Sequence, residues 1–342
     1  MSKSIVSVVK CDEHDIEKAV ADAVHLIGGL EDVKGKKVIS IKPNLSTPKA
    51  SASGATTDLR IVEALIKKIN SINPCEIRIV ETNNSRATAD KTFEYLGYKD
   101  LAKRYENVQC INLSKDNKIR VKLNGEIFSS IIVPESMIFS DYLISVAKMK
   151  THVDYVYTGA LKNQFGLLLG SRARYHGVMS KVLVDLNRFY KPDLAVIDGL
   201  IGMQGFGPLD GDPKFAGVIV ASRDLVAADT VASRIMKLDP SRISYLSYVQ
   251  KRKLWDCKKI QVVGARLNEV ATDFEFIPSK YFYIGKFSLF LQKLARYLEN
   301  LATLMSLSRS ALSTVKLSTL EQRLSYMELF QLAKDTVSKI DD

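Results

Sequence analysis

Residues 37–71 read KVISIKPNLSTPKASASGATTDLRIVEALIKKINS, a β-branched run, a polar loop and an amphipathic segment. The β-branched run predicts a strand, and the apolar spacing after residue 58 predicts a helix. The same alternation recurs from residue 4 to about 265, which is typical of α/β architecture: a mainly parallel sheet with helices on both faces. The predicted strands are 5–9, 37–42, 76–81, 141–147, 194–198 and 218–221; the predicted helices are 14–27, 58–71, 89–105, 177–190 and 225–237. We therefore predict an α/β domain over residues 1–265.

Two segments depart from this alternation. Residues 119–133, IRVKLNGEIFSSIIV, predict a β-hairpin at the sheet edge, with Asn124-Gly125 as a type I′ turn. Residues 266–342 are predicted to form a C-terminal helical extension, in which 280–308 and 318–340 make a helical hairpin. This hairpin packs on its own domain, on a second copy of the chain, on a partner protein, or on a membrane surface; the sequence leaves these alternatives open.

Composition narrows the class of protein. The chain has 342 residues, of which 46% are hydrophobic and 25% charged, which excludes a disordered or collagen-like chain. The four cysteines lie far apart without a CxxC pair, which argues against a disulfide scaffold or zinc ribbon and favours a reducing, cytoplasmic compartment. We recognise no secretory signal and no apolar stretch long enough to form a transmembrane segment.

The charge balance indicates the kind of partner. A formal net charge of +11 favours anions, namely carboxylated or phosphorylated small molecules, nucleic acid, or an acidic membrane surface. Charge alone does not choose among them.

Polar residues follow the predicted strands, where α/β sheets bind ligands. Lys42 and Asn44 close the second strand, and Asn83 follows the third within ETNNSRAT. Thr56 and Thr57 precede the helix at 58–71, where they either cap it or border an anion site. We therefore predict these five residues to be ligand-binding, with turn and capping roles as the alternative.

The densest group of titratable residues lies in 148–176, KMKTHVDYVYTGALKNQFGLLLGSRARYH, which we expect to be a loop, a helix and a second loop. Histidine suits proton transfer near neutral pH, and a lysine among other cations has a lowered pKa. We therefore predict His152, His176 and Lys150 as catalytic candidates. The predicted ligand-binding residues of this segment are Lys148, Lys162, Asn163, Arg172 and Arg174.

Aspartates and glycines dominate the next polar region. Asp198 ends an apolar strand and is a further catalytic candidate, which would orient a histidine or bind a metal. Asp198, Asp210 and Asp212 offer carboxylates for a divalent cation such as Mg²⁺, although aspartate and glycine are also ordinary turn residues. Asn187, in the DLN sequence at 185–187, completes the predicted ligand-binding set.

These motifs together resemble a known family. KPNLS, ATTD, KMKTH, ALKNQFGLLLG, RARYH, DLN, PDLAVIDGLIGMQGFGPLDGDP and RDLVAADTVASRIMKLDP occur here in the order of the domain of unknown function 362 family, over residues 5–255. The resemblance implies an uncharacterised archaeal or bacterial protein of a family that is sometimes joined to iron-sulfur modules. No cysteine follows residue 263 in this chain, so we expect no intrinsic iron-sulfur cluster. A cluster supplied by a partner protein is the alternative.

Three functions fit these observations. The first is a cytoplasmic enzyme for an anionic small molecule, of undetermined reaction and cofactor, whose anion is bound by Lys42, Lys150, Lys162 and Arg174. The second is a nucleic-acid-binding module that uses the same basic residues with Tyr155, Tyr157 and Tyr175. The third is an accessory protein of an iron-sulfur or other electron-transfer complex, which docks through residues 280–340.

Overall fold

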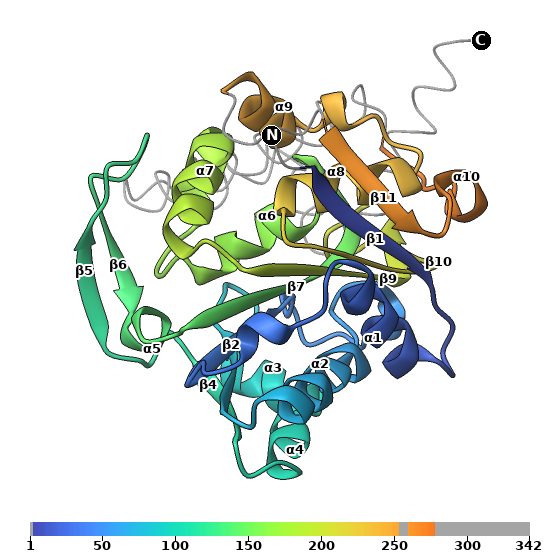
Figure 1. The fold of residues 1–342 in the computed structure, drawn as a ribbon. Helices are drawn as coiled ribbons and strands as arrows, with labels where there is room; N and C mark the ends of the chain where they lie inside the picture. The colour runs from blue at the N-terminus through green and yellow to red at the C-terminus, as the bar shows by residue number, and fades with distance from the viewer. Residues whose placement is uncertain (1–2, 253–258, 278–342) are drawn as a thin grey trace, which may run out of the picture. The chain divides into compact units, whose positions relative to one another are not determined.

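The computed structural model describes residues 3–252 and 259–277 (Figure 1). The strands are β1 (Ser4–Lys10), β2 (Val38–Pro43), β3 (Glu76–Glu81), β4 (Val108–Asn112), β5 (Lys118–Lys122), β6 (Ser130–Pro134), β7 (Tyr142–His152), β8 (Val156–Thr158), β9 (Leu194–Gln204), β10 (Asp212–Ser222) and β11 (Ile260–Gly264). The α-helices are α1 (Ile16–Leu26), α2 (Leu59–Ile72), α3 (Ala89–Tyr95), α4 (Tyr98–Lys103), α5 (Glu135–Ile138), α6 (Ala160–Asn163), α7 (Met179–Tyr190), α8 (Leu225–Ile235), α9 (Ser244–Lys251) and α10 (Leu267–Val270).

The main sheet is mixed, with mostly parallel neighbours. Its strand order is β11-β1-β10-β9-β7-β2-β3-β4, and β8 pairs with the end of β7. Strands β9, β7, β2, β3 and β4 run parallel, as do β1 and β11, whereas β10 is antiparallel to both of its neighbours. The predicted α/β architecture is therefore confirmed.

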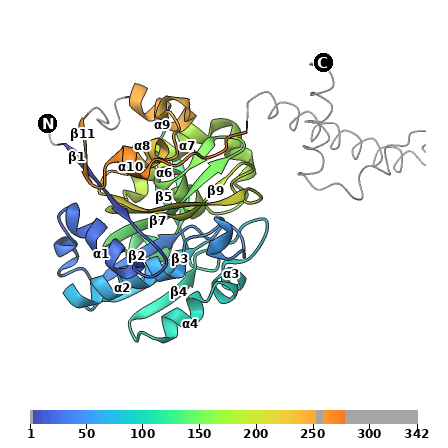
Figure 2. The same cartoon turned by 90° about the vertical axis from the view of Figure 1, so that its right-hand side faces the viewer.

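Each face of the sheet has its own hydrophobic core. Helices α1 to α4 lie on one face and α6 to α9 on the other (Figure 2). Helix α2 shows why: Ile61, Leu65 and Ile69 recur at helical spacing and are fully buried, so one side of the helix must face the sheet. Covering both faces accounts for the apolar character of the central strands.

Several predicted boundaries need correction. Strand β7 continues to His152 and β9 to Gln204, so the charged sequence KMKTH lies on a strand and not in a loop. The predicted helix over 89–105 is two helices, because Gly97 adopts a left-handed conformation with φ of 78°. Strands β4, β8 and β11 were not predicted; their short runs lack the long apolar signal of the central strands.

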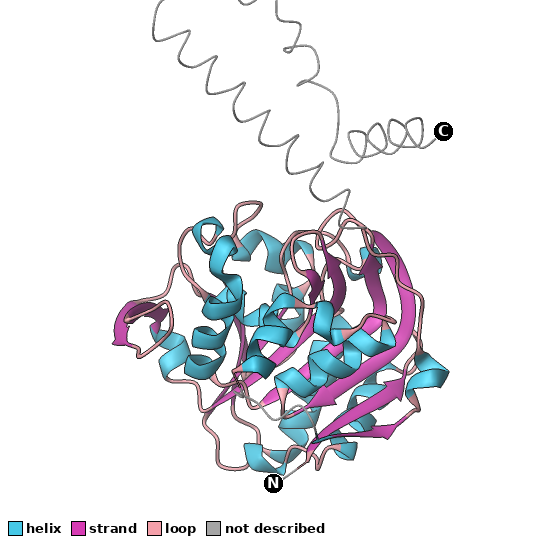
Figure 3. Cartoon of the chain, turned by 90° about the horizontal axis from the view of Figure 1, so that it is seen from above, coloured by secondary structure: helices cyan, strands magenta, loops and turns pink. Residues whose placement is uncertain are grey.

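The predicted hairpin forms, but not as a continuation of the main sheet. Strands β5 and β6 pair antiparallel in a separate two-stranded sheet, which Figures 1 and 3 both place away from the main one. The predicted two-residue turn at Asn124-Gly125 is wrong, because the connection runs from residue 123 to 129. Its shape is set by Asp185 of α7, whose buried carboxylate accepts backbone N–H bonds from Glu126, Ile127 and Phe128 at 2.7–3.0 Å.

The α/β unit extends beyond its predicted end at residue 265. Val270 of α10 and Phe274 are buried in the core formed with α8, so this unit reaches residue 276. The predicted helical hairpin at 280–340 lies outside the described residues. Within the described residues, no helix has the length and apolar character needed to cross a membrane.

A buried ion pair joins β7, β9 and the start of α2. Lys148 donates to Asp198 at 2.8 Å, and both side chains are at most 1% exposed. The same carboxylate accepts the backbone N–H of Asp58, the N-cap residue of α2, at 2.8 Å and that of Leu200 at 3.1 Å. Asp198 therefore fixes the loop before α2 to the centre of the sheet.

Replacement of Asp198 is expected to destabilise the protein strongly. Asp198→Ala leaves the Lys148 ammonium buried without a carboxylate, which costs about 3–5 kcal/mol. The double variant Lys148→Met/Asp198→Leu removes both charges and should recover part of that loss, because the N–H groups of Asp58 and Leu200 still lack their acceptor. Urea titration measures the free energy of unfolding, with Asp210→Ala as an exposed control expected to change it by less than about 0.5 kcal/mol. A double variant no more stable than Asp198→Ala would contradict this role.

Candidate functional site

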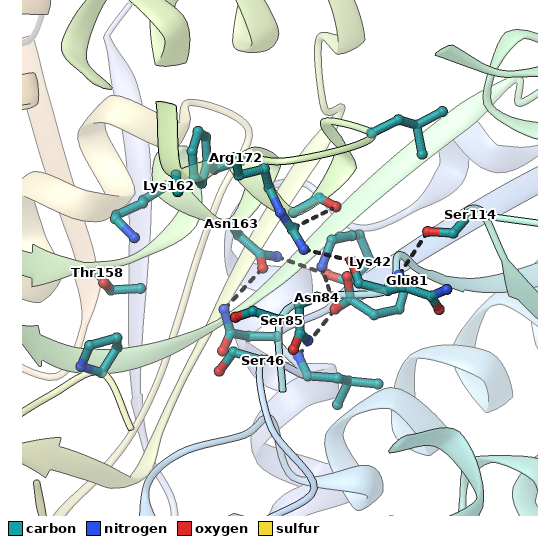
Figure 4. A pocket seen from close by; sticks show the side chains of 18 of the residues that line it. Lys42, Ser46, Glu81, Asn84, Ser85, Ser114, Thr158, Lys162, Asn163 and Arg172 are labelled. Carbon is teal, nitrogen blue, oxygen red and sulfur yellow. Dashed lines mark hydrogen bonds and ion pairs between the residues drawn. The ribbon is translucent and has the colours of Figure 1, made fainter. Parts of the chain in front are cut away.

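A polar cavity of about 780 Å³ lies where β2 and β3 end and along the last part of β7 (Figure 4). Its position at the carboxyl ends of parallel strands is the ordinary ligand position of such sheets. Of the residues predicted from the sequence, the structure brings the following to its wall: Lys42, Asn44, Asn83, Lys150, His152, Lys162, Asn163, Arg172 and His176.

Lys42 lines the cavity but is paired with Glu81. Its ammonium donates to the Glu81 carboxylate at 2.8 Å and to the carbonyl of Pro43 at 2.8 Å. Burial lowers the pKa of Lys42, and the attraction of Glu81 opposes that shift. Because Glu81 compensates the charge, Lys42 contributes little net charge to the cavity and acts mainly to connect β2 with β3.

Lys150 is solvated by neutral oxygens. Its ammonium donates to Asn44 Oδ1 at 2.9 Å, to the carbonyl of Ala55 at 2.8 Å and to Ser46 Oγ at 3.4 Å. Asn44 in turn donates to Asn163, whose amide donates to the carbonyl of Lys42. Burial lowers the pKa of Lys150 well below its ordinary value, with further lowering by Lys162 and Lys148. Its three oxygen acceptors match the three N–H groups of an ammonium, and no carboxylate lies within ion-pair distance of it among the described residues.

Lys162 and Arg172 supply two more cations. The ammonium of Lys162 lies 5.5 Å from the ring centre of Tyr155 and 5.9 Å from that of Phe165. Burial lowers the pKa of Lys162 to about 8, and Arg172 adds to that lowering. Arg172 is held by the carbonyls of Asn83 at 2.8 Å and Gly166 at 3.2 Å, so its guanidinium is fixed at the cavity wall.

Short helix α6 carries Lys162 and Asn163, and a buried carboxylate holds its first turn. Asp229 of α8 accepts the backbone N–H groups of Ala160 at 2.6 Å and Leu161 at 3.0 Å. Burial raises the pKa of Asp229 to about 7. Asp229 thereby fixes the direction in which Lys162 leaves the backbone.

The two predicted histidines both border the cavity. Burial, Lys162 and Lys150 keep the pKa of His152 well below its ordinary value, so the ring is neutral near pH 7. His152 Nδ1 accepts the backbone N–H of Asp154 at 3.0 Å, which places the proton of the neutral ring on Nε2. His176 is exposed and lies edge-on to Tyr155. His152 is thus the better-fixed proton carrier of the two.

The backbone beside His152 is strained. Val156 opens β8 opposite His152 and has φ of 67°, a conformation that β-branched residues rarely adopt. Strain of this kind persists where the surrounding structure fixes it, and it is frequent at ligand sites.

Six of the predicted catalytic and ligand-binding residues do not line the cavity. Thr57 donates to the carbonyl of Val146 and Thr56 to that of Lys49, so both hold the loop before α2. The remaining four are Lys148 and Asp198, which form the buried pair; Arg174, which is exposed over the Tyr175 ring; and Asn187, which donates to carbonyls of Leu161 and Leu183.

The structure does not bring the three aspartates predicted for a metal together. Asp198 is buried in its pair with Lys148, whereas the partly exposed Asp210 pairs with Lys49 at 3.0 Å and Arg86 at 3.7 Å. Among the described residues, no group of three or more histidine, cysteine, aspartate or glutamate side chains is placed to hold a metal ion. The expected metal site is therefore not formed by these residues.

Comparison with known proteins identifies the family. The profile of the domain of unknown function DUF362 matches residues 39–234, more than half of the chain. The chain belongs to the DUF362 family. The described residues that line the cavity, from Lys42 to Pro208, all lie within this match.

Two further proteins are similar to this one. The thylakoid-associated protein sll1697 of Synechocystis sp. (strain ATCC 27184 / PCC 6803 / Kazusa) is 25% identical over 252 residues, which cover 70% of this chain and 76% of that protein. The lactate racemase apoprotein from Thermoanaerobacterium thermosaccharolyticum has 12% identity and a TM-score of 0.44, over 68% of this chain and 57% of that one.

Some cavity residues were not among the predicted site residues. Glu81 closes β3 and pairs with Lys42, and its position at a strand end was the signal available in the sequence. Thr158 and Phe165 reach the cavity through the β7–β8 pairing and the turn after α6, which no local pattern indicates.

Lys162→Met is expected to stabilise the protein at neutral pH. Because the pKa of Lys162 falls from 10.5 to about 8 on folding, the unfolded chain binds more protons between these pH values. The free energy of unfolding therefore rises with pH across that window, and Lys162→Met lacks this contribution. At pH 7 the variant should exceed the wild type on the order of 1–2 kcal/mol, since one pKa unit corresponds to about 1.4 kcal/mol. Urea titrations at pH 7 and pH 9.5 measure both; equal pH dependence in the two proteins would count against the assignment.

Proposed function

We propose that this protein binds a small carboxylated or phosphorylated molecule in the polar cavity, and that His152 carries a proton to or from it. The observation that carries the proposal is the excess of positive charge at the cavity wall, where Lys150 is buried and Lys162 and Arg172 are half-buried. Lys150, Lys162 and Arg172 all line the cavity and form no ion pair within the described residues, whereas Glu81 is committed to Lys42. An uncompensated buried cation is costly, and a bound anion supplies the missing charge.

The size and lining of the cavity suit a ligand of this kind. About 780 Å³ falls within the range of small-molecule sites. Arg172 offers the planar fork that matches a carboxylate or phosphate, and Lys150 offers a fixed point charge. Side chains from Ser46, Asn83 and Ser114 add neutral hydrogen-bonding groups along the same wall.

His152 is the group placed to move a proton. It is neutral near pH 7 and 7% exposed, and Nδ1 accepts the Asp154 N–H, so the ring carries its proton on Nε2 and takes up a second one at Nδ1 in place of that bond. The neighbouring Lys150 and Lys162 disfavour the imidazolium, and a bound anion weakens that effect. Ligand binding therefore promotes proton uptake by His152, as a general acid–base group requires.

We also place the protein in a reducing, cytoplasmic compartment. Cys11, Cys75 and Cys110 are free thiols in the structure, and burial raises the pKa of Cys11 and Cys110 to about 12. Such thiols are protonated and unreactive, which suits structural roles.

Neutralising a cavity cation should weaken anion binding, and neutralising its exposed neighbour should not. Arg172→Met removes the guanidinium from the cavity and is expected to weaken binding of inorganic phosphate or succinate by at least tenfold. Arg174→Met, two residues away and outside the cavity, is the matched control and should change the Kd less than twofold. Isothermal titration calorimetry measures both.

The same titrations test the proposal as a whole. Wild-type protein that binds neither phosphate, succinate nor 3-phosphoglycerate, but binds a single-stranded oligonucleotide with steep salt dependence, would favour the nucleic-acid alternative. Equal loss of affinity in Arg172→Met and Arg174→Met would indicate a surface effect and overturn the cavity as the site.

Anion binding at pH 6 should take up protons. Lys162, with a pKa of about 8, is already protonated at that pH, whereas a bound anion raises the pKa of His152. The pKa of buried Lys150 is also lowered, so the His152→Gln variant is needed to identify the share of the uptake that belongs to His152. Calorimetry with succinate in two buffers of different ionisation enthalpy gives the number of protons bound. His152→Gln should remove that share of the uptake while retaining affinity within a few-fold; unchanged uptake in that variant would remove His152 from the proposed role.

A further inference from the structure

Four lysines line the cavity. Lys118, at the start of β5, is exposed, and of the other three one differs from its two neighbours. Lys42 donates to Glu81 and Pro43, and Lys150 donates to three oxygens, so both ammonium groups are occupied. Lys162 makes no hydrogen bond or ion pair to any other described residue. Its nitrogen lies near the rings of Tyr155 and Phe165, which offer no lone pair that could accept a hydrogen bond from it. Lys162 therefore has the nitrogen best placed to react.

A second polar group faces the same end of the cavity without a protein partner. The Thr158 side chain is only 4% exposed, lines the cavity, and its hydroxyl has no hydrogen-bond partner among the described residues. Figure 4 shows Thr158 and Lys162 together at one end of the pocket, apart from Ser114 and Glu81. A buried hydroxyl without a partner loses free energy, which a bound ligand oxygen would restore.

We propose that Lys162 forms a Schiff base with the carbonyl carbon of a small oxo acid. The inference rests on the proposed function, because Lys150 and Arg172 hold the anionic group of the same molecule. The charge of Lys162 lowers the pKa of Lys150, and the charge of Arg172 lowers the pKa of Lys162. The three cations are therefore close enough to surround one ligand. A lysine desolvated beside other cations is the form of this side chain that attacks carbonyl groups.

The step balances without an oxidant or reductant. The lone pair of Lys162 Nζ attacks the carbonyl carbon, and the carbonyl π electrons move to its oxygen, which takes a proton. Thr158 can hydrogen-bond this oxygen. The nitrogen then loses one proton, the hydroxyl takes a second proton and leaves as water, and the nitrogen lone pair forms the carbon–nitrogen double bond. The product is the protonated iminium, formed with the release of one water and the net uptake of one proton.

His152 lies near the imine and can take part in the proton transfer that follows its formation. An iminium withdraws electrons from the adjacent carbon and makes its C–H bond acidic. His152 and Lys162 both border the Tyr155 ring, at 5.0 Å between ring centres and 5.5 Å from the nitrogen. Nε2 of the neutral ring already carries a proton, so the imidazole accepts the C–H proton at Nδ1, after the ring turns and gives up its bond to the Asp154 N–H. With that turn, proton abstraction beside the carbonyl is the class of reaction that we propose.

Reductive trapping tests the covalent step. Full-length protein is treated at pH 7 with glyoxylate, an oxo acid small enough for this cavity, and sodium cyanoborohydride, followed by peptide mass mapping. We expect one adduct per chain at Lys162, formed at least tenfold faster than adducts at exposed lysines such as Lys181. At this pH a lysine with a pKa of about 8 has roughly a tenth of its amine unprotonated, far more than a surface lysine.

Matched variants separate covalent reaction from binding. Lys162→Arg keeps the positive charge but cannot form the imine, so it should bind succinate within a few-fold of wild type and lose the fast adduct. Lys181→Met should leave both unchanged. Exchange of the pyruvate methyl protons in D₂O, followed by NMR, should be accelerated by wild type and lost in both Lys162→Arg and His152→Gln.

The outcomes distinguish the two proposals. Succinate binding without preferential labelling of Lys162 would overturn the Schiff base and leave the anion site standing. Absence of both would overturn the proposed function as well. Fast labelling that persists at another residue in Lys162→Arg would assign the reactive amine elsewhere and reject this inference.

Discussion

Three buried lysines lie toward the carboxyl ends of the parallel strands, and each is only 1% exposed: Lys42, Lys148 and Lys150. Their burial constrains the strands and loops that surround them. An ammonium in the protein interior must recover the hydration it has lost. Lys42 does so through Glu81, Lys148 through Asp198, and Lys150 through neutral oxygens. Each solution recruits a partner from a different strand or loop, so satisfying these charges is also what draws β2, β3, β7, β9 and the loop before α2 together.

The sequence predicted the sheet well, because its signal is local. Apolar β-branched runs and amphipathic helices reveal themselves within a dozen residues, and these determined the α/β architecture. The end of β7 was misjudged because a run of charged residues ordinarily faces solvent. What buries Lys148 and Lys150 are Asp198, 50 positions along the chain, and Asn44, 106 positions away, and no local pattern contains them.

The same contrast between local signals and distant partners applies to the residues of the candidate site. Residues directly after strands, such as Asn44 and Asn83, were found because strand ends meet at one edge of a sheet. Asp198 was selected by the same rule, but it lies within β9 and its charge is used internally by Lys148. A site with this much unmatched positive charge reduces the stability of the empty protein. Sites that break local rules in this way are where function is expected to reside.

The clamp between Asp185 and the loop of the β5–β6 hairpin also bears on the order of folding. Among the described strands, β5 and β6 pair only with each other, and the carboxylate that shapes their loop lies 57–59 positions further along the chain. Bringing Asp185 to residues 126–128 closes a long loop of chain, and the entropic cost of that closure is not offset by the pairing of β5 with β6. We therefore expect the hairpin to become ordered only after α7 has docked, late in the folding of the domain. Its amides should gain protection from hydrogen exchange at that stage.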